Sequence, residues 1–182
     1  HLAAGAAAAD GDAPQLRYWR ALTLSFQGYL LATREPARAD EALALIDRAI
    51  ALNADLANVA ATLEALNSQG NVLAALGRWA AARDVYAKHV ALCERLGSDN
   101  ERIFAHVGLG GALLELGDVA GARAQAEAGA LLAARQQRRF PESYALALGG
   151  RAAIDAGEPA AGLARVRAGV ALAVEIGNRY AE

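Results

Sequence analysis

The chain has 182 residues, with 18 basic and 20 acidic side chains, and its net charge of −2 gives no global field that would draw it to nucleic acid or to anionic lipid. Aromatic residues make up 5% of an alanine-rich sequence without methionine, which favours helices packed through small side chains. The single cysteine, Cys93, excludes an internal disulfide framework and a multi-thiolate metal site. No stretch approaches the roughly 20 apolar residues of a membrane span and no signal peptide is recognisable, so we expect a cytoplasmic protein.

The predicted elements are helices that follow one another in pairs. Residues 1–13 are expected to be the end of a preceding unit or a linker, and residues 178–182 the start of a further helix or a truncated end. Between them we expect four helical hairpins, at about 14–56, 57–98, 99–138 and 139–177. The helices themselves are predicted at about 14–33, 40–53, 63–76, 79–96, 100–116, 119–136, 141–156 and 159–176. Pro14, Pro141 and Pro159 suit first turns, and a loop through Pro36 is expected to join the first pair.

The units are related by a constant period in the sequence. Gly77 returns as Gly117 and Gly157, and in each unit it suits a left-handed helix end. Another glycine lies seven residues before each of these positions, and a small residue lies five residues after it. These positions are Gly70, Gly110 and Gly150, followed by Ala82, Ala122 and Gly162.

Glycine in a helix interior costs about 1 kcal/mol relative to alanine, so its return at positions 70, 110 and 150 requires a compensating benefit. The simplest benefit is close approach of the paired helix, with the small residues at 82, 122 and 162 on the facing surface. The sequence therefore predicts stacked helical hairpins interlocked through small residues.

The order of these residues resembles the tetratricopeptide repeat. The residues that carry the resemblance are Leu66, Gly70, Leu73, Gly77, Trp79, Ala82 and Tyr86. The later units keep the glycines and the small residue but replace the aromatics. The period, longer than that of the common tetratricopeptide form, resembles the longer repeats of bacterial signalling and transcriptional regulators. The resemblance implies an all-α fold, a right-handed superhelical α-solenoid of stacked antiparallel helix pairs, with a concave groove for a ligand.

Catalytic and metal-binding residues are not recognisable in the sequence. The histidines, His1, His89 and His106, have no metal-ligand spacing, and His89 is interpreted as a packing residue. Cys93 lies in an apolar run and is expected to be a small core residue. The carboxylates Asp84, Glu94, Asp118 and Glu127 are expected to have ordinary solvated roles. We therefore expect no enzyme activity, no cofactor and no metal.

Two groups of residues are candidates for binding. The first adjoins the recurring glycines on the expected groove and consists of Ser25, Tyr29, Glu64, Asn67, Asn71, Phe104, Val107, Tyr144 and Arg151. The second is a candidate basic patch, formed by Arg135, Arg138 and Arg139. The alternative for this patch is positive charge at a helix C-terminus, which complements the helix dipole.

These features predict a noncatalytic protein-interaction and regulatory scaffold, and the resemblance implies that it belongs to a bacterial signalling or transcription-regulatory protein. Its expected partner is a peptide, a partner protein or another domain of the same polypeptide, with no direct contact to nucleic acid or membrane. The alternative is a small-molecule sensor that controls an attached output domain, such as a nucleotide cyclase, a diguanylate cyclase or a DNA-binding domain. A homodimer through the exposed ends of the solenoid is also considered.

Overall fold

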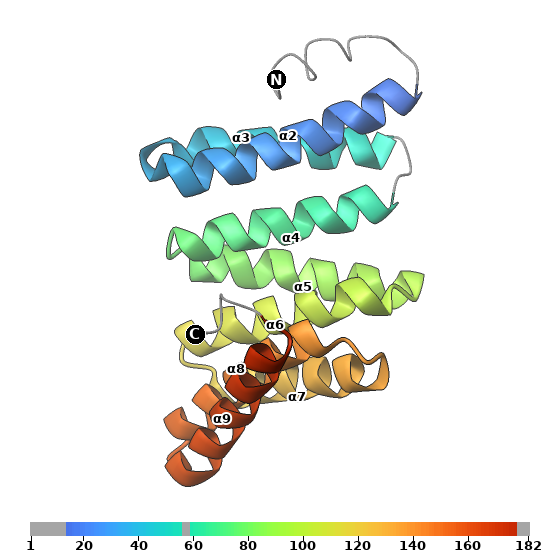
Figure 1. Ribbon diagram of the computed structural model, residues 1–182. Coiled ribbons are helices and arrows are strands. Elements are labelled where there is room, and N and C mark those ends of the chain that lie inside the picture. Colours follow the sequence, from blue (N-terminus) through green and yellow to red (C-terminus); the bar gives the residue numbers. More distant parts are fainter. Residues whose placement is uncertain (1–13, 56–58, 178–182) are drawn as a thin grey trace. The chain divides into compact units, whose positions relative to one another are not determined.

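A computed structural model describes residues 14–55 and 59–177, and the predictions for 1–13 and 178–182 lie outside this part of the chain (Figure 1). Within it the regular elements are helices, and no strand occurs. In chain order these are α2 (Pro14–Arg34), the short 3₁₀ helix η1 (Pro36–Arg38), α3 (Ala39–Asp55), α4 (Val59–Ala75), α5 (Trp79–Leu96), α6 (Asp99–Glu115), α7 (Val119–Arg135), α8 (Arg139–Asp155) and α9 (Pro159–Glu175).

The chain divides into two compact units, with the boundary between Ala81 and Ala82. In the first unit, α3 packs on both α2 and α4, around a core that includes Ala42, Ile46 and Val72. In the second unit, α7 packs on α6, α8 on α7 and α9 on α8, and Figure 1 shows α8 and α9 side by side. Helices that pack on their successive neighbours make an α-solenoid, so the all-α prediction is confirmed. The division into four hairpins and the handedness of a superhelix stay predictions.

The predicted helix bounds agree with the observed ones to within about two residues for most ends, the usual difference between ways of assigning a helix terminus. Pro159 is the first residue of α9, as predicted. Pro141 lies in the first turn of α8, which begins at Arg139, and the predicted loop between α2 and α3 contains a short 3₁₀ turn that begins at Pro36. In the described ranges, no helix has both the length and the apolar character needed to cross a membrane.

The helices from α4 onward are followed by left-handed residues at a constant spacing. Five of these positions are glycines with positive φ, namely Gly77, Gly97, Gly117, Gly157 and Gly177. The sixth is Gln137, which has a φ of 56°. The period recognised in the sequence is thus built from two halves of equal length, and Gln137 interrupts the glycine pattern without changing the geometry.

The same pair of backbone hydrogen bonds closes the turns at residues 77, 97, 117, 137 and 157. After α6, the amide of Gly117 donates to the carbonyl of Leu114 at 3.0 Å, and the next amide, of Asp118, donates to Leu113 at 2.9 Å. After α7, the amide of Gln137 donates to Ala134 at 3.1 Å. This is the Schellman arrangement, in which a left-handed residue follows the helix and satisfies its last carbonyl groups.

The left-handed conformation of Gln137 leads to a stability prediction. Gln137→Gly should raise the free energy of unfolding by about 0.5–1 kcal/mol, because glycine adopts positive φ without the penalty of a side chain. The matched control is Gln136→Gly, at the neighbouring position, where φ is −95° and glycine brings no such relief. Urea unfolding followed by circular dichroism measures both variants. A Gln137→Gly variant no more stable than Gln136→Gly would contradict the prediction.

The recurring interior glycines allow close approach of paired helices, as predicted. A Cβ atom on Gly150 would lie 2.7 Å from the carbonyl oxygen of Gly162, and a Cβ on Gly162 would lie 2.6 Å from the oxygen of Gly150. In the preceding pair, a Cβ on Gly110 would lie 3.2 Å from the oxygen of Ala122. The interlocking of α8 with α9 and of α6 with α7 is therefore confirmed. The corresponding pairing of residues 70 and 82 stays a prediction.

Candidate functional site

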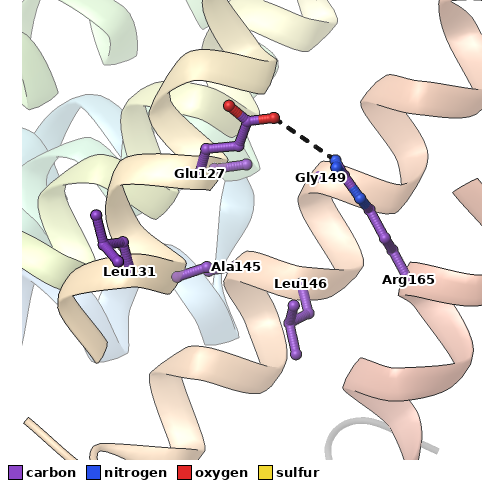
Figure 2. Close-up of a pocket in the computed structure, with 8 residues that line it drawn as sticks. Glu127, Leu131, Ala145, Leu146, Gly149 and Arg165 are labelled. Atoms are coloured by element: carbon purple, nitrogen blue, oxygen red, sulfur yellow. Dashed lines mark ion pairs between the residues drawn. The ribbon is translucent and has the colours of Figure 1, made fainter. Parts of the chain in front are cut away.

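The second unit contains an apolar cavity with a volume of about 320 Å³ between α7, α8 and α9 (Figure 2). We call it the α7–α9 cavity. Its lining residues are Ala126, Glu127, Ala130 and Leu131 from α7, Ala145, Leu146 and Gly149 from α8, and Arg165 from α9. The volume lies at the lower end of the range for small-molecule sites, about 300–1,000 Å³, and the predominantly apolar lining with few polar groups is typical of such sites.

Small side chains create the cavity. Ala126 and Ala145 are each 1% exposed, and they face the space from neighbouring helices. Gly149 lies one turn after Ala145 on α8. A Cβ atom on Gly149 would be 3.5 Å from Ala126 Cβ of α7 and 3.8 Å from Arg165 Nη1 of α9. Leu131, which is 55% exposed, stands at the open side. Small residues spaced four apart on a helix face thus leave a hollow where larger residues would fill the space.

Two of the residues that line the cavity carry opposite charges and lie close together. Figure 2 shows Glu127 of α7 and Arg165 of α9 pointing toward one another across Gly149 of α8. The distance between Arg165 Nη1 and Glu127 Oε1 is 3.7 Å, long for an ion pair. Both side chains are partly exposed, so the attraction is weakened by solvent and contributes little to stability.

The same Glu127 oxygen also accepts a hydrogen bond from Arg123. Arg123 Nε donates to Glu127 Oε1 at 3.3 Å, and Arg123 Nη1 donates to Glu158 Oε1 at 2.9 Å. The hydrogen bonds to Glu158 and then to Glu127 raise the pKa of Arg123. The four side chains form an alternating row, Glu158, Arg123, Glu127 and Arg165, in which Arg165 is the terminal cation. Glu127 therefore keeps a partner if Arg165 turns to another anion.

A second cavity, of about 710 Å³, lies in the first unit. It is lined by Gln27, Leu30, Leu31 and Arg34 of α2, Arg38 of η1, Glu41 and Leu45 of α3, and Glu35 between α2 and η1. Arg38 donates to Glu41 and to Glu35 at 2.8 to 3.0 Å, and the hydrogen bonds to Glu35 and then Glu41 raise its pKa. Arg38 therefore already has two short carboxylate contacts, and Arg34 is a second cation in the lining of this cavity.

The predicted groove residues differ in their exposure. Tyr29 is 39% and Tyr144 is 37% exposed. Glu64, Asn71 and Arg151 are exposed, whereas Asn67, Phe104 and Val107 are half-buried. The assignment of these residues to a concave binding face stays a prediction. None of the nine predicted residues lines the α7–α9 cavity.

Ser25, one of the predicted groove residues, is buried. Ser25 is 5% exposed, because this part of α2 packs closely against α3. One turn further on, a Cβ on Gly28 would lie 2.6 Å from both Ala42 O and Ile46 Cγ1. Arg151, in contrast, is accessible but engaged, since its Nη1 lies 2.7 Å from Glu115 Oε1.

The predicted basic patch is less strongly cationic than the sequence indicates. Arg135 lies in the last turn of α7, which fits the helix-dipole alternative. Arg138 is the exposed residue immediately before α8. Arg139, the first residue of α8, is paired with Glu175 of α9. The carboxylate that neutralises Arg139 is 36 residues away in the sequence, so charge counting along the loop did not include it.

The buried face of α5 holds the one histidine of the described residues that is fully enclosed. His89 is 0% exposed, and neither of its ring nitrogens has a hydrogen-bond partner. Burial lowers the pKa of His89 to about 4. Cys93, one turn further on, is also 0% exposed, and burial raises the pKa of its thiol to about 11. The predictions that both residues belong to the core are confirmed, and neither the imidazole nor the thiol is placed for reaction with a solvent-borne substrate.

Sequence reasoning missed the α7–α9 cavity. It recognised Glu127 only as a solvated carboxylate and did not single out Arg165. A signal was present in the small residues spaced four apart on two consecutive helices, Ala126 with Ala130 and Ala145 with Gly149. Among the described residues, no group of three or more His, Cys, Asp or Glu side chains is arranged to hold a metal ion.

The arrangement defines a helical-repeat protein, with consecutive packed helices and a small apolar cavity between three of them. Comparison of the sequence with protein-family models and with curated proteins gave no match.

Proposed function

We propose that the chain is a noncatalytic interaction and regulatory module with tetratricopeptide-like repeats. What supports the repeat type is the pairing of Gly110 with Ala122 and of Gly150 with Gly162, which places the small residues of the tetratricopeptide pattern where two helix backbones meet. By the same resemblance we propose a bacterial signalling or transcription-regulatory protein of the cytoplasm. The partner is a peptide or protein domain rather than nucleic acid or membrane.

The observation that carries this proposal is an exposed aromatic pair on α8. The rings of Phe140 and Tyr144 pack edge to face, with centroids 5.2 Å apart and planes at 61°. Phe140 is 43% and Tyr144 is 37% exposed, so each ring keeps a large surface for a partner. Exposed aromatic residues of this kind serve as anchors in protein interfaces because they bury a large area and lose little conformational entropy.

The charges beside the aromatic pair favour an acidic partner segment. Arg138 precedes α8 and is exposed, and Arg135 ends α7 just before the turn that contains Gln137. An apolar side chain of the partner would pack on the rings of Phe140 and Tyr144, and an adjacent carboxylate would reach the guanidinium of Arg138. We call Phe140, Tyr144 and Arg138 the α8 interaction surface.

Site-specific crosslinking tests the α8 interaction surface. The photoreactive residue p-benzoylphenylalanine is placed at Phe140 in the full chain within its producing cell, and at Leu163 as a control. Leu163 is 48% exposed but lies near the start of α9 and does not belong to this surface. We expect a discrete adduct from position 140, weakened by Arg138→Glu and Tyr144→Ala, and none from position 163. Equal labelling at both positions, or an adduct insensitive to these substitutions, would contradict the proposal.

The α7–α9 cavity supports a second function, small-molecule sensing. A hollow of about 320 Å³ that is lined by three helices is better suited to a compact ligand than to an extended peptide backbone. Occupancy would change contacts among α7, α8 and α9, and through them the state of an attached output domain. A homodimer through exposed helices at the ends of the repeat array also remains a proposal.

A further inference from the structure

We propose that the α7–α9 cavity binds a small organic carboxylate with an apolar body, and that its carboxylate takes Arg165 from Glu127. This inference rests on the small-molecule-sensing function and names its ligand class. The chemistry follows from two features of the cavity, an apolar hollow formed by α7 and α8 and a terminal arginine supplied by α9.

The apolar part of the cavity selects the body of the ligand. Its walls are alkyl side chains, from Ala130 and Leu131 on one helix and Ala145 and Leu146 on the next. These side chains offer no hydrogen-bonding groups, so a sugar or a polyhydroxylated metabolite would lose its hydration there without replacement. An aliphatic chain or an aromatic ring would bury apolar surface, including that of the exposed Leu131.

The charged part of the cavity selects the sign of the head group. Arg165 has five N–H donors, and the ion pair that the structure gives it among the described residues is the 3.7 Å contact with Glu127. Glu127 has a closer contact with Arg123, at 3.3 Å. A ligand carboxylate that binds Arg165 bidentately therefore replaces a weak contact with a stronger one and leaves no charge unpaired.

A cationic ligand is disfavoured by the same row of charges. Glu127 already faces two guanidinium groups, so an ammonium group would have to displace one of them and would face the other at short range. In this arrangement Glu127 competes with the ligand carboxylate for Arg165. Glu127 contacts Arg165 in the absence of the ligand, and this contact weakens the apparent affinity of the cavity for the ligand.

Titration of the full chain with octanoate tests the inference, with acetate and octylammonium as companion probes. Isothermal titration calorimetry measures affinity, and amide chemical shifts of Ala130, Leu131 and Leu146 report the location. We expect octanoate to bind saturably and acetate and octylammonium to bind at least tenfold more weakly. Arg165→Gln should weaken octanoate binding about tenfold, and Glu127→Gln should strengthen it about threefold or more because Arg165 is released.

The matched control is Glu175→Gln. It also removes a carboxylate from an arginine, Arg139, but at a place that does not line the cavity. This variant should leave octanoate affinity unchanged. Because Glu127, Arg165 and Glu175 are exposed side chains, circular dichroism should show that all three variants keep the helical fold.

The inference would be overturned if octanoate bound no more tightly than acetate in both the parent chain and Glu127→Gln, or if Arg165→Gln left the octanoate affinity unchanged. It would also be overturned if Glu175→Gln raised the octanoate affinity as much as Glu127→Gln does, or if octanoate changed amide chemical shifts only outside the cavity. Dependence of the crosslinked partner on Arg165 together with no octanoate binding would likewise overturn it in favour of a partner side chain. Crosslinking at Phe140 uses a surface that does not line the cavity, so failure of this inference and failure of the interaction function are distinguishable.

Discussion

Gly150→Ala is expected to lower the free energy of unfolding by about 2 kcal/mol, although alanine is the better helix former by about 1 kcal/mol. The new Cβ would lie 2.7 Å from Gly162 O and 2.9 Å from Val166 N, and both of these are backbone atoms. Neither can rotate away as a flexible side chain does, so α8 and α9 must separate. Urea unfolding and amide hydrogen exchange of α8 and α9 measure the loss.

Gly111→Ala is the matched control for this effect. Gly111 lies in the interior of α6, and a Cβ there would meet no other atom within 4 Å. Its substitution should raise stability by about 0.5–1 kcal/mol through helix propensity alone. Gly162→Ala should resemble Gly150→Ala, and the double variant should cost less than the sum because both substitutions force the same two helices apart. If Gly150→Ala were as stable as Gly111→Ala, the close helix contact would be disproved.

The free energy of unfolding is also expected to fall in mild acid because of His89. The pKa of His89 is about 4 in the folded protein, whereas an unfolded histidine has a pKa of about 6.5. Between these values the unfolded chain binds more protons, so stability is full above about pH 6.5 and decreases as the pH falls toward 4. The free energy of unfolding decreases by about 3 kcal/mol, because the pKa of His89 is lower by about 2.5 in the folded protein and a difference of one in pKa corresponds to about 1.36 kcal/mol.

His89→Leu should remove this acid-induced loss. The substitution eliminates two buried nitrogens that have no hydrogen-bond partner, so stability at pH 7 should be nearly unchanged or higher. A His106→Asn variant is the control, because it still carries His89 and should keep the loss. His106 differs in its setting, since its Nδ1 lies 2.7 Å from Gln125 Oε1. Unfolding curves at several pH values measure the difference, and identical acid sensitivity of His89→Leu and the parent chain would refute the assignment.

The helical fold could be predicted because its signals are local or strictly periodic. Gly77, Gly117 and Gly157 end helices through a backbone conformation that other residues adopt at a cost, so the sequence displays each turn directly. Gln137 adopts the same conformation without a sequence signal, and for this reason the division of the period into equal halves was not recognised. The burial of Ser25 also escaped prediction, because it depends on how closely α2 and α3 approach at Gly28.

The candidate site was far less predictable than the fold. A cavity depends on what three helices leave unfilled, and no single helix pattern records that quantity. Glu127 looks like any solvated acid in the sequence, and Arg165 lies far along the chain from it, on another helix. Tyr144 was predicted as a groove residue from its place beside the recurring glycines. Its ring contact with Phe140 was not predicted, although residues four apart on a helix lie on the same face.

The equal spacing of the left-handed turns has a consequence for how such a gene can change length. Corresponding turns, such as those at Gly117 and Gly157, are closed by the same backbone hydrogen bonds. An in-frame duplication or deletion of one whole period therefore rejoins two equivalent turns and keeps every later helix in its place within a pair. A change of half a period would instead exchange the two helices of each later pair. We therefore expect gain and loss of whole periods to be the route by which this chain can lengthen or shorten without disturbing its packing.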